Sequence, residues 1–252
     1  MIRDGAEPAT WTGKSLSVEI LFSRPGIATQ IWLGYPGGGF LVDIGDGSLR
    51  DLLEHSYHPK TIGGVICTHG HFDHVGGLHS ILGYLRMIGR TKPLQLIGPP
   101  GCVELWKAVE SFRHFYEDST PFEILCTEMH DRQVVQIDGV SIMAFPVVHC
   151  GSIATGLVLD QVPALGYRVS LGGETVAITG DTGFCDTLQD LVADADLAVL
   201  EATFAESEGV SPEVLNNVHL SEDVARKVGR QAKRYMLVHR GAGPPVGPFL
   251  SQ

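Results

Sequence analysis

The segment ICTHGHFDHVGG, residues 66–77, places three histidines and one aspartate within six positions, directly after an apolar run. Residues i and i+2 of an extended segment point to the same face, about 6.5–7 Å apart, so His69 and His71 can converge on one cation. Asp73 and His74 follow at the expected start of a helix, where they can reach a second cation beside the first. Packing gives no reason for such a cluster, whereas metal binding does.

Three further candidate ligands each stand at the end of an apolar, strand-like run. His149 ends AFPVVH, Asp181 ends VAITGD, and His239 ends YMLVH. Side chains at strand ends are positioned by a rigid sheet, which is what a metal or catalytic site needs. Nitrogen and carboxylate donors of this kind suit zinc, manganese or iron. The residues therefore predict a metal site assembled from distant parts of the chain.

Hydrophobic periodicity predicts the elements that must hold these side chains. Strands are expected over residues 16–22, 29–35, 40–45, 63–69, 94–98, 122–126, 133–137, 140–148, 156–160, 167–171, 175–179, 196–201 and 235–239. Helices are expected over residues 75–89, 102–115, 186–195 and 221–234, the last with Ser221 as its N-cap. Such an alternation indicates a layered α/β protein and leaves the topology open.

Composition limits the classes of protein to consider. The 252 residues, 44% of them hydrophobic, suit one domain spanning residues 1–252. No run approaches the roughly 20 apolar residues that cross a bilayer, and residues 1–15 lack the apolar stretch of a signal peptide. We therefore expect a cytoplasmic protein without membrane contact. A net charge of −11 argues against broad nucleic-acid binding, although a bound dication can reverse the field locally.

The order of these motifs resembles the metallo-β-lactamase superfamily over nearly the full length of the chain. The resemblance rests on THGHFDHVGGL, the later His149, the GDT at residues 180–182 and the His239 of the last strand. It implies a four-layer αββα sandwich with its site at one edge of the two sheets. The implied ligands are His69, His71 and His149 for one metal ion, Asp73, His74 and His239 for the other, and Asp181 as the bridge.

A narrower resemblance is to the ribonuclease Z and phosphodiesterase branch. LVDIGDGSLRDLL, GYRV, LEATF and VHLSEDVA match that branch in order. The resemblance implies that Glu201 and His219 form a proton-donating pair, and a carboxylate bonded to an imidazole has the physical properties for that role. The chain carries no counterpart of the branch's tRNA-gripping arm, because only a short segment separates His149 from Asp181.

These observations favour a hydrolase that uses two divalent metal ions, zinc first and manganese or iron as alternatives, to activate water against a phosphodiester. Its candidate catalytic residues are Asp73, Glu201 and His219. A thioester, lactone or sulfate-ester hydrolase is the alternative, and tRNA processing, a mono-iron sulfur-oxidising enzyme and a noncatalytic binding protein are less favoured. The expected partner is a small ester substrate rather than nucleic acid, and relatives of this kind allow a homodimer.

Overall fold

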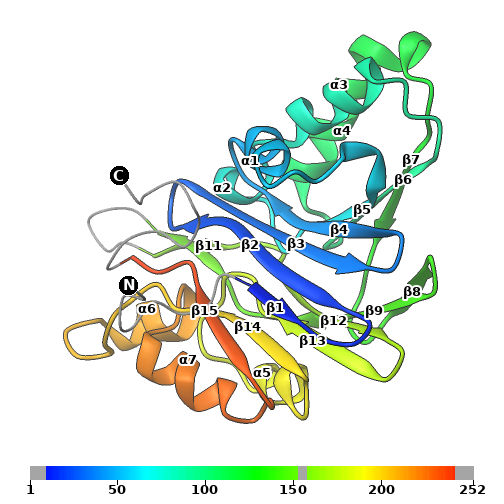
Figure 1. Ribbon diagram of the computed structural model, residues 1–252. Coiled ribbons are helices and arrows are strands. Elements are labelled where there is room, and N and C mark those ends of the chain that lie inside the picture. Colours follow the sequence, from blue (N-terminus) through cyan, green and yellow to red (C-terminus); the bar gives the residue numbers. More distant parts are fainter. Residues whose placement is uncertain (1–9, 153–157, 242–252) are drawn as a thin grey trace.

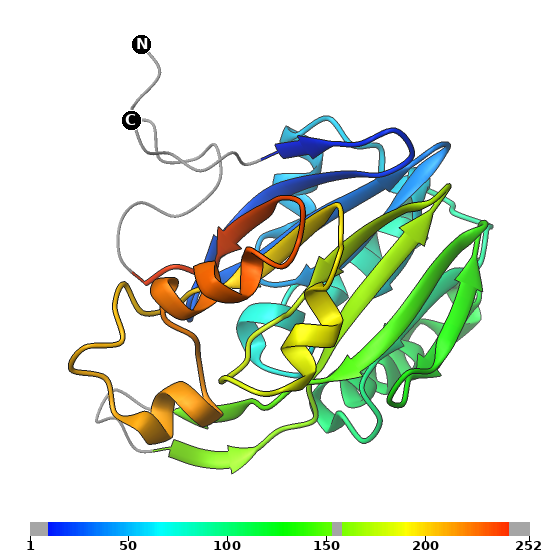
Figure 2. The same ribbon diagram turned by 90° about the horizontal axis from the view of Figure 1, so that it is seen from below.

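The computed structural model of the chain describes residues 10–152 and 158–241 (Figures 1 and 2). Most of the polar N-terminal segment considered above, and the first two residues of the strand expected over 156–160, lie outside the described residues. Among the helices of those two ranges, none combines the length and the apolar composition that crossing a membrane requires.

Seven strands form the first sheet, and their spatial order is also their order in the chain. Their bounds are β1 Thr10–Thr12, β2 Ser17–Arg24, β3 Ala28–Tyr35, β4 Gly38–Ile44, β5 Ile62–Ile66, β6 Leu94–Gly98 and β7 Ile124–Glu128. β1 to β4 pair antiparallel, whereas β4 to β7 pair parallel. Parallel neighbours end at the same edge of a sheet, so β4 and β5 bring Asp43 and His69 to one edge.

Six strands form the second sheet, in the order β15-β14-β13-β12-β9-β8. Their bounds are β8 Val134–Ile137, β9 Val140–Pro146, β12 Leu165–Leu171, β13 Glu174–Ile178, β14 Leu197–Glu201 and β15 Tyr235–Val238. β13, β14 and β15 pair parallel, so Asp181, Glu201 and His239 follow or end neighbouring strands at one edge. A separate antiparallel pair consists of β10 Cys150–Ser152 and β11 Val158–Gln161.

The larger helices cover the outer faces of the two sheets (Figure 1). On the first sheet lie α1 Ser48–Glu54, α3 Leu78–Met87 and α4 Val103–Tyr116, and on the second α5 Thr187–Val192 and α7 Glu222–Gly229. The shorter helices are α2 Phe72–Val75, α6 Pro212–Asn217 and the 3₁₀ turns η1 Pro59–Thr61 and η2 Glu117–Ser119. Helices α3 and α4 each turn one apolar stripe toward the sheet, which is why their hydrophobic residues recur at helical spacing.

Three apolar cores hold the layers together. The central core lies between the sheets and includes Ile31 of the first and Tyr167 of the second. One outer core packs α3 and α4 on the first sheet around Phe112, and the other packs α5 and α7 on the second around Leu191. This helix–sheet–sheet–helix layering confirms the expected αββα sandwich.

The structure corrects several predicted boundaries. The helix expected over residues 75–89 is α3, which spans Leu78–Met87, and Val75 instead ends the separate helix α2, before a glycine pair. The helix expected over 221–234 ends at Gly229. Ser221 does occupy its N-cap position, but its hydroxyl makes no capping bond and lies 2.7 Å from the Ser207 hydroxyl. Helices α1 and α6 were not expected, since both are too short to show a clear period.

Candidate metal centre

All the side chains that the sequence names as metal ligands come from loops or from the short helix α2 at one edge of the sandwich. His69 and His71 follow β5, Asp73 and His74 lie in α2, His149 follows β9, Asp181 follows β13, and His239 follows β15. Figure 1 shows α2 and the C-terminal end of β15 at the same edge. The two sheets therefore deliver donors from opposite halves of the chain to one place, as expected for a site held by strand ends.

Three imidazoles form the first half of the cluster. His69 Nε2 lies 3.1 Å from His71 Nδ1, and His149 Nε2 lies 3.0 Å from the same atom. A tetrahedral zinc with Zn–N bonds of 2.0–2.1 Å would space its nitrogen ligands about 3.3 Å apart. The three nitrogens therefore already lie near the spacing that a single cation needs.

Two imidazoles and two carboxylates form the second half. Asp181 Oδ2 lies 3.3 Å from His74 Nε2 and 3.2 Å from His239 Nε2. Asp73 Oδ2 lies 3.5 Å from His239 Nε2 and 3.9 Å from His74 Nε2. Both Nε2 atoms are buried and have no hydrogen-bond partner among the described residues. Buried polar nitrogens without partners are costly, and a cation between them and the carboxylates would satisfy them, so the residues present fit a divalent metal.

Hydrogen bonds on the far side of His74 and His69 orient these two rings. Asp43 Oδ2 accepts from His74 Nδ1 at 2.8 Å and from Thr68 Oγ1 at 2.8 Å. Because the Thr68 hydroxyl donates to Asp43, it accepts from His69 Nδ1 at 3.1 Å. Each ring therefore carries its proton on Nδ1 and presents the Nε2 lone pair to the cluster, as metal-binding histidines require.

His149 and His239 are oriented in the same way by other partners. His149 Nδ1 donates to the Val218 carbonyl at 2.8 Å. His239 Nδ1 lies 2.9 Å from Thr203 Oγ1, whose own proton goes to Glu201 Oε2 at 3.1 Å. His239 also has a φ of 54°, an uncommon conformation for a residue with a side chain. Such strain persists only where the surroundings impose it, and here it turns the ring into the cluster.

Burial and the neighbouring carboxylates give the rings of the cluster different pKa values. Burial lowers the pKa of His149 to about 3 and that of His69 well below its usual value, so both rings are neutral near pH 7. Burial alone would raise the pKa of Asp181, but His239 and His74 outweigh it and hold the pKa well below its ordinary value. Burial opposes protonation of His74, but Asp181 and Asp43 outweigh it and raise the pKa of that ring well above its usual value, so a divalent ion would displace the His74 proton on binding.

His219 and Glu201 lie next to this cluster. His219 Nδ1 is 3.2 Å from Glu201 Oε1 and 3.9 Å from Asp181 Oδ2. Glu201 is 1% exposed, and its two oxygens also accept from the backbone N–H groups of Leu220 at 2.8 Å and Thr203 at 2.9 Å. Burial opposes protonation of His219, but the Glu201 carboxylate outweighs it and raises the pKa of His219. The structure thus pairs these two residues as the sequence suggested.

A cavity of about 750 Å³ opens over the cluster. Its lining includes His71, Asp73, Asp181, His219 and His239, so the candidate ligands and the candidate proton donor face the same space. A substrate of small-molecule size would fit such a volume.

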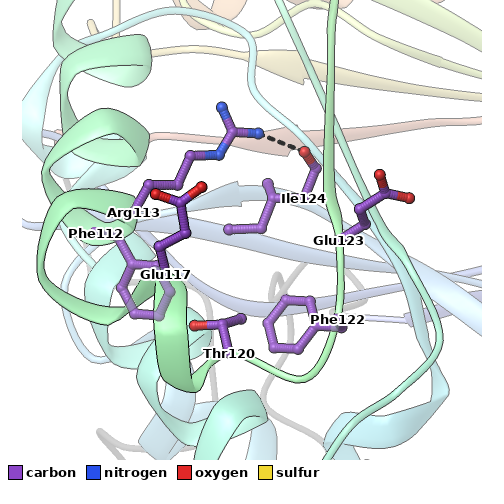
Figure 3. Close-up of a pocket in the computed structure, with 7 residues that line it drawn as sticks. All are labelled: Phe112, Arg113, Glu117, Thr120, Phe122, Glu123 and Ile124. Carbon is purple, nitrogen blue, oxygen red and sulfur yellow. Dashed lines mark hydrogen bonds between the residues drawn. The ribbon is translucent and has the colours of Figure 1, made fainter.

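A second cavity, of about 400 Å³, lies between α4 and β7 (Figure 3). Arg113 in its wall donates to the Ile124 carbonyl at 2.5 Å, and Phe112 and Phe122 form its apolar side. Within residues 10–152 and 158–241, every group of side chains close enough to hold a metal lies instead at the histidine cluster. The cavity over that cluster is therefore the candidate site.

Sequence reasoning did not find several residues that shape the site. Asp43 lies at the end of β4 and Asp46 just after it, but Asp43 contacts His74, whereas Asp46 is exposed. Thr68 precedes His69, and Thr203 stands inside LEATF, but nothing in their type or spacing shows which ring each contacts. The contacts of Asp43 with His74 and of Thr203 with His239 arise only where segments distant in sequence meet.

Comparisons with known proteins agree with this geometry. The pattern of the family described as "Beta-lactamase superfamily domain" matches residues 40–240, which is most of the chain. The chain therefore belongs to the β-lactamase superfamily. A curated relative named ribonuclease Z, from Geobacillus kaustophilus, is 28% identical over 251 residues, covering 84% of this chain and 81% of the relative.

Solved structures show the same fold. The metallo-β-lactamase fold protein YhfI from Bacillus subtilis matches with a TM-score of 0.72 at 18% identity, covering 92% of this chain and 88% of that one. The short form of human tRNase Z matches with a TM-score of 0.70 at 21% identity, covering 88% and 92%. Taken with the cluster of His and Asp side chains, the family defines this chain as a metal-dependent hydrolase that binds divalent metal.

Proposed function

We propose that the protein hydrolyses phosphodiesters at a centre of two divalent metal ions, with zinc as the native metal. His69, His71 and His149 would hold one ion, Asp73, His74 and His239 the other, and Asp181 would bridge them. The observation that carries the proposal is the His219–Glu201 pair, 3.2 Å apart, beside the bridging candidate Asp181 and in the wall of the same cavity.

When bound, two such ions lower the pKa of a water molecule and neutralise the nonbridging oxygens of a phosphate. The chain's own residues then supply the proton. Glu201 accepts from His219 Nδ1, which leaves the other ring nitrogen to donate to a departing oxygen. A buried carboxylate at this position stabilises the imidazolium and fixes the ring, as a general acid requires.

The pairing of His219 with Glu201 suits an alkoxide leaving group better than a thiolate leaving group. An alkoxide is a far stronger base than a thiolate, so its departure gains more from a positioned proton donor. The proton donor therefore favours a phosphate or carboxylate ester of an alcohol over a thioester. The relatives named ribonuclease Z, a name that refers to cleavage of RNA phosphodiesters, favour the phosphate ester.

The test compares leaving groups in the zinc-loaded enzyme and its His219→Ala variant. We expect hydrolysis of bis(p-nitrophenyl) phosphate and of a dinucleoside monophosphate, but not of S-lactoylglutathione or a simple lactone. His219→Ala should lower kcat about 10²–10⁴-fold for the alkoxide leaving group and much less for p-nitrophenolate, which needs no proton. Its metal content should stay that of the wild type.

Two outcomes would contradict the proposal. Preferred hydrolysis of the thioester or lactone would overturn the substrate class. Loss of metal from His219→Ala, measured by elemental analysis, would show that His219 is a ligand instead of a proton donor.

A further inference from the structure

The wall of the metal cavity carries large apolar side chains that packing does not explain. Phe72 is 67% exposed although it stands between His71 and Asp73, and Leu159 on β11 is 47% exposed. Phe204, half-buried, lines the same cavity. A single exposed apolar residue is ordinary on a protein surface, but three around one functional cavity mark a binding surface.

The same wall provides no Lys or Arg side chain. Among the lining residues that the structure describes, none is Lys or Arg, and the sequence of residues 153–157, IATGL, carries no charge. Arg240, next to His239, is tied to Glu222 through its Nε at 2.6 Å. The chain has a net charge of −11, and His219, the proton donor of the proposed reaction, is the cation that the described lining offers to the reacting phosphate, so a second phosphate would have no Lys or Arg partner there.

Phe204 lies where the leaving group would emerge. Its ring centroid is 6.2 Å from that of His219, with the rings at 70° in an edge-to-face arrangement. A group whose oxygen receives its proton from His219 would therefore contact the Phe204 ring. An apolar or aromatic group gains from that contact, whereas a charged one loses hydration without a partner.

Phe72 and Leu159 form the wall on the His71 side. A Cβ placed on Gly151 would lie 3.4 Å from Leu159 Cδ1 and 3.6 Å from His71 Nε2. These are ordinary van der Waals distances, so Gly151 lies between the apolar wall and a candidate ligand, in contact range of both.

We propose that the cavity selects small phosphodiesters with uncharged aromatic or aliphatic substituents, with Phe204 contacting the leaving group and Phe72 and Leu159 the retained one. This rests on the proposed function. In the reaction, the oxygen of water bonds to phosphorus, the P–O bond to the leaving group breaks, and that oxygen takes its proton from His219. This selection disfavours a polynucleotide, because its neighbouring phosphates find no Lys or Arg among the described residues that line the cavity.

The activity test uses two esters that release the same p-nitrophenolate. Bis(p-nitrophenyl) phosphate carries an aromatic retained group, and methyl p-nitrophenyl phosphate a small one. We expect the zinc-loaded enzyme to favour the first by about two- to tenfold in KM, the range of one aromatic contact. Phe72→Ala should remove this preference, whereas Phe204→Ala should raise KM for both esters. Phe115→Ala, an equally exposed ring (72%) on α4, is the matched control and should change neither.

A binding test separates this inference from the proposed function. Calorimetry on the zinc-loaded protein should show phenyl phosphate binding about two- to tenfold more tightly than methyl phosphate, with Phe72→Ala removing the difference. If neither ester is hydrolysed but phenyl phosphate still binds more tightly than methyl phosphate, the proposed function is wrong and the inference of an apolar binding surface is supported. Equal binding of the two ligands, or faster cleavage of single-stranded RNA than of the aryl ester, would overturn the inference.

Discussion

Replacing Asp43 by Asn should weaken metal binding without deforming the backbone. Asp43 is buried at the end of β4, and its φ is 57°, a left-handed conformation that Asn adopts more readily than most residues. Its two oxygens accept from Thr68 N and Thr68 Oγ1, each at 2.8 Å, and from His74 Nδ1 at 2.8 Å. An amide has one accepting oxygen, so at least one of these three donors must lose its acceptor.

The expected magnitude follows from the role of His74. An uncharged acceptor at Nδ1 makes the ring less basic, so its Nε2 binds a cation placed between it, Asp73 and Asp181 less tightly. Removing a partner of this kind costs about 10–100-fold in metal affinity, which corresponds to about 1.4–2.7 kcal/mol. The ion near His74 should weaken most, because His69 contacts Asp43 only through Thr68.

The assay is a zinc titration of the metal-free protein against a chromophoric chelator, with Asp46→Asn as the matched control. Asp46 lies close in sequence and loses the same charge, but it is exposed and its carboxylate has no contact with a histidine among the described residues. We expect the affinity for one zinc ion to be lower in Asp43→Asn, and the affinity for zinc to be unchanged in Asp46→Asn. Equal affinities in both variants would refute the argument that Asp43 orients a ligand.

Three further predictions test other parts of the structure. Asp181→Asn should remove bound metal and activity together, as elemental analysis and phosphodiester hydrolysis would show. Phe112→Ala should lower the free energy of unfolding in urea by about 3–5 kcal/mol, because the ring is buried between α4 and the first sheet. Burial opposes ionisation of Glu174, but the N–H groups of residues 14–16 outweigh it and lower its pKa below 4.5. The ionised Glu174 therefore stabilises the folded protein above pH 4.5, and this contribution is lost as the pH falls through that lower pKa. In Glu174→Gln the thermal stability should fall less steeply over the same range of pH.

The fold was largely predictable because its strands are short, apolar and bounded by turns. β3 is buried at nearly every position, and β6 was expected over the residues at which it forms. Where prediction erred, tertiary contacts made a helix begin later or end earlier than expected. Gly77, the N-cap of α3, donates its N–H to the Ile44 carbonyl of the first sheet at 2.7 Å. Local periodicity does not contain that contact.

The candidate site was predictable only as a set of residue types. The HGHFDH segment is local, so its chemistry is visible in the sequence, and the pairing of Glu201 with His219 followed from a resemblance. The exposure of Phe72 was not predictable, because the same spacing would suit a residue buried under the helix. Whether a side chain faces the core or a cavity depends on the neighbours that the fold supplies.

The sequence by itself determined which donors this protein has, and that they stand at the ends of strands, because donor chemistry and strand periodicity are properties of short segments. Only the tertiary structure decided that Asp43 holds His74, that Thr203 links His239 to Glu201, and that Phe204 lies beside His219. The physical reason is that parallel strands of two packed sheets end at one edge. Residues more than a hundred positions apart then come within hydrogen-bonding distance, as His239 N and Ser23 Oγ do at 2.8 Å, and their partners are set by packing rather than by order in the chain.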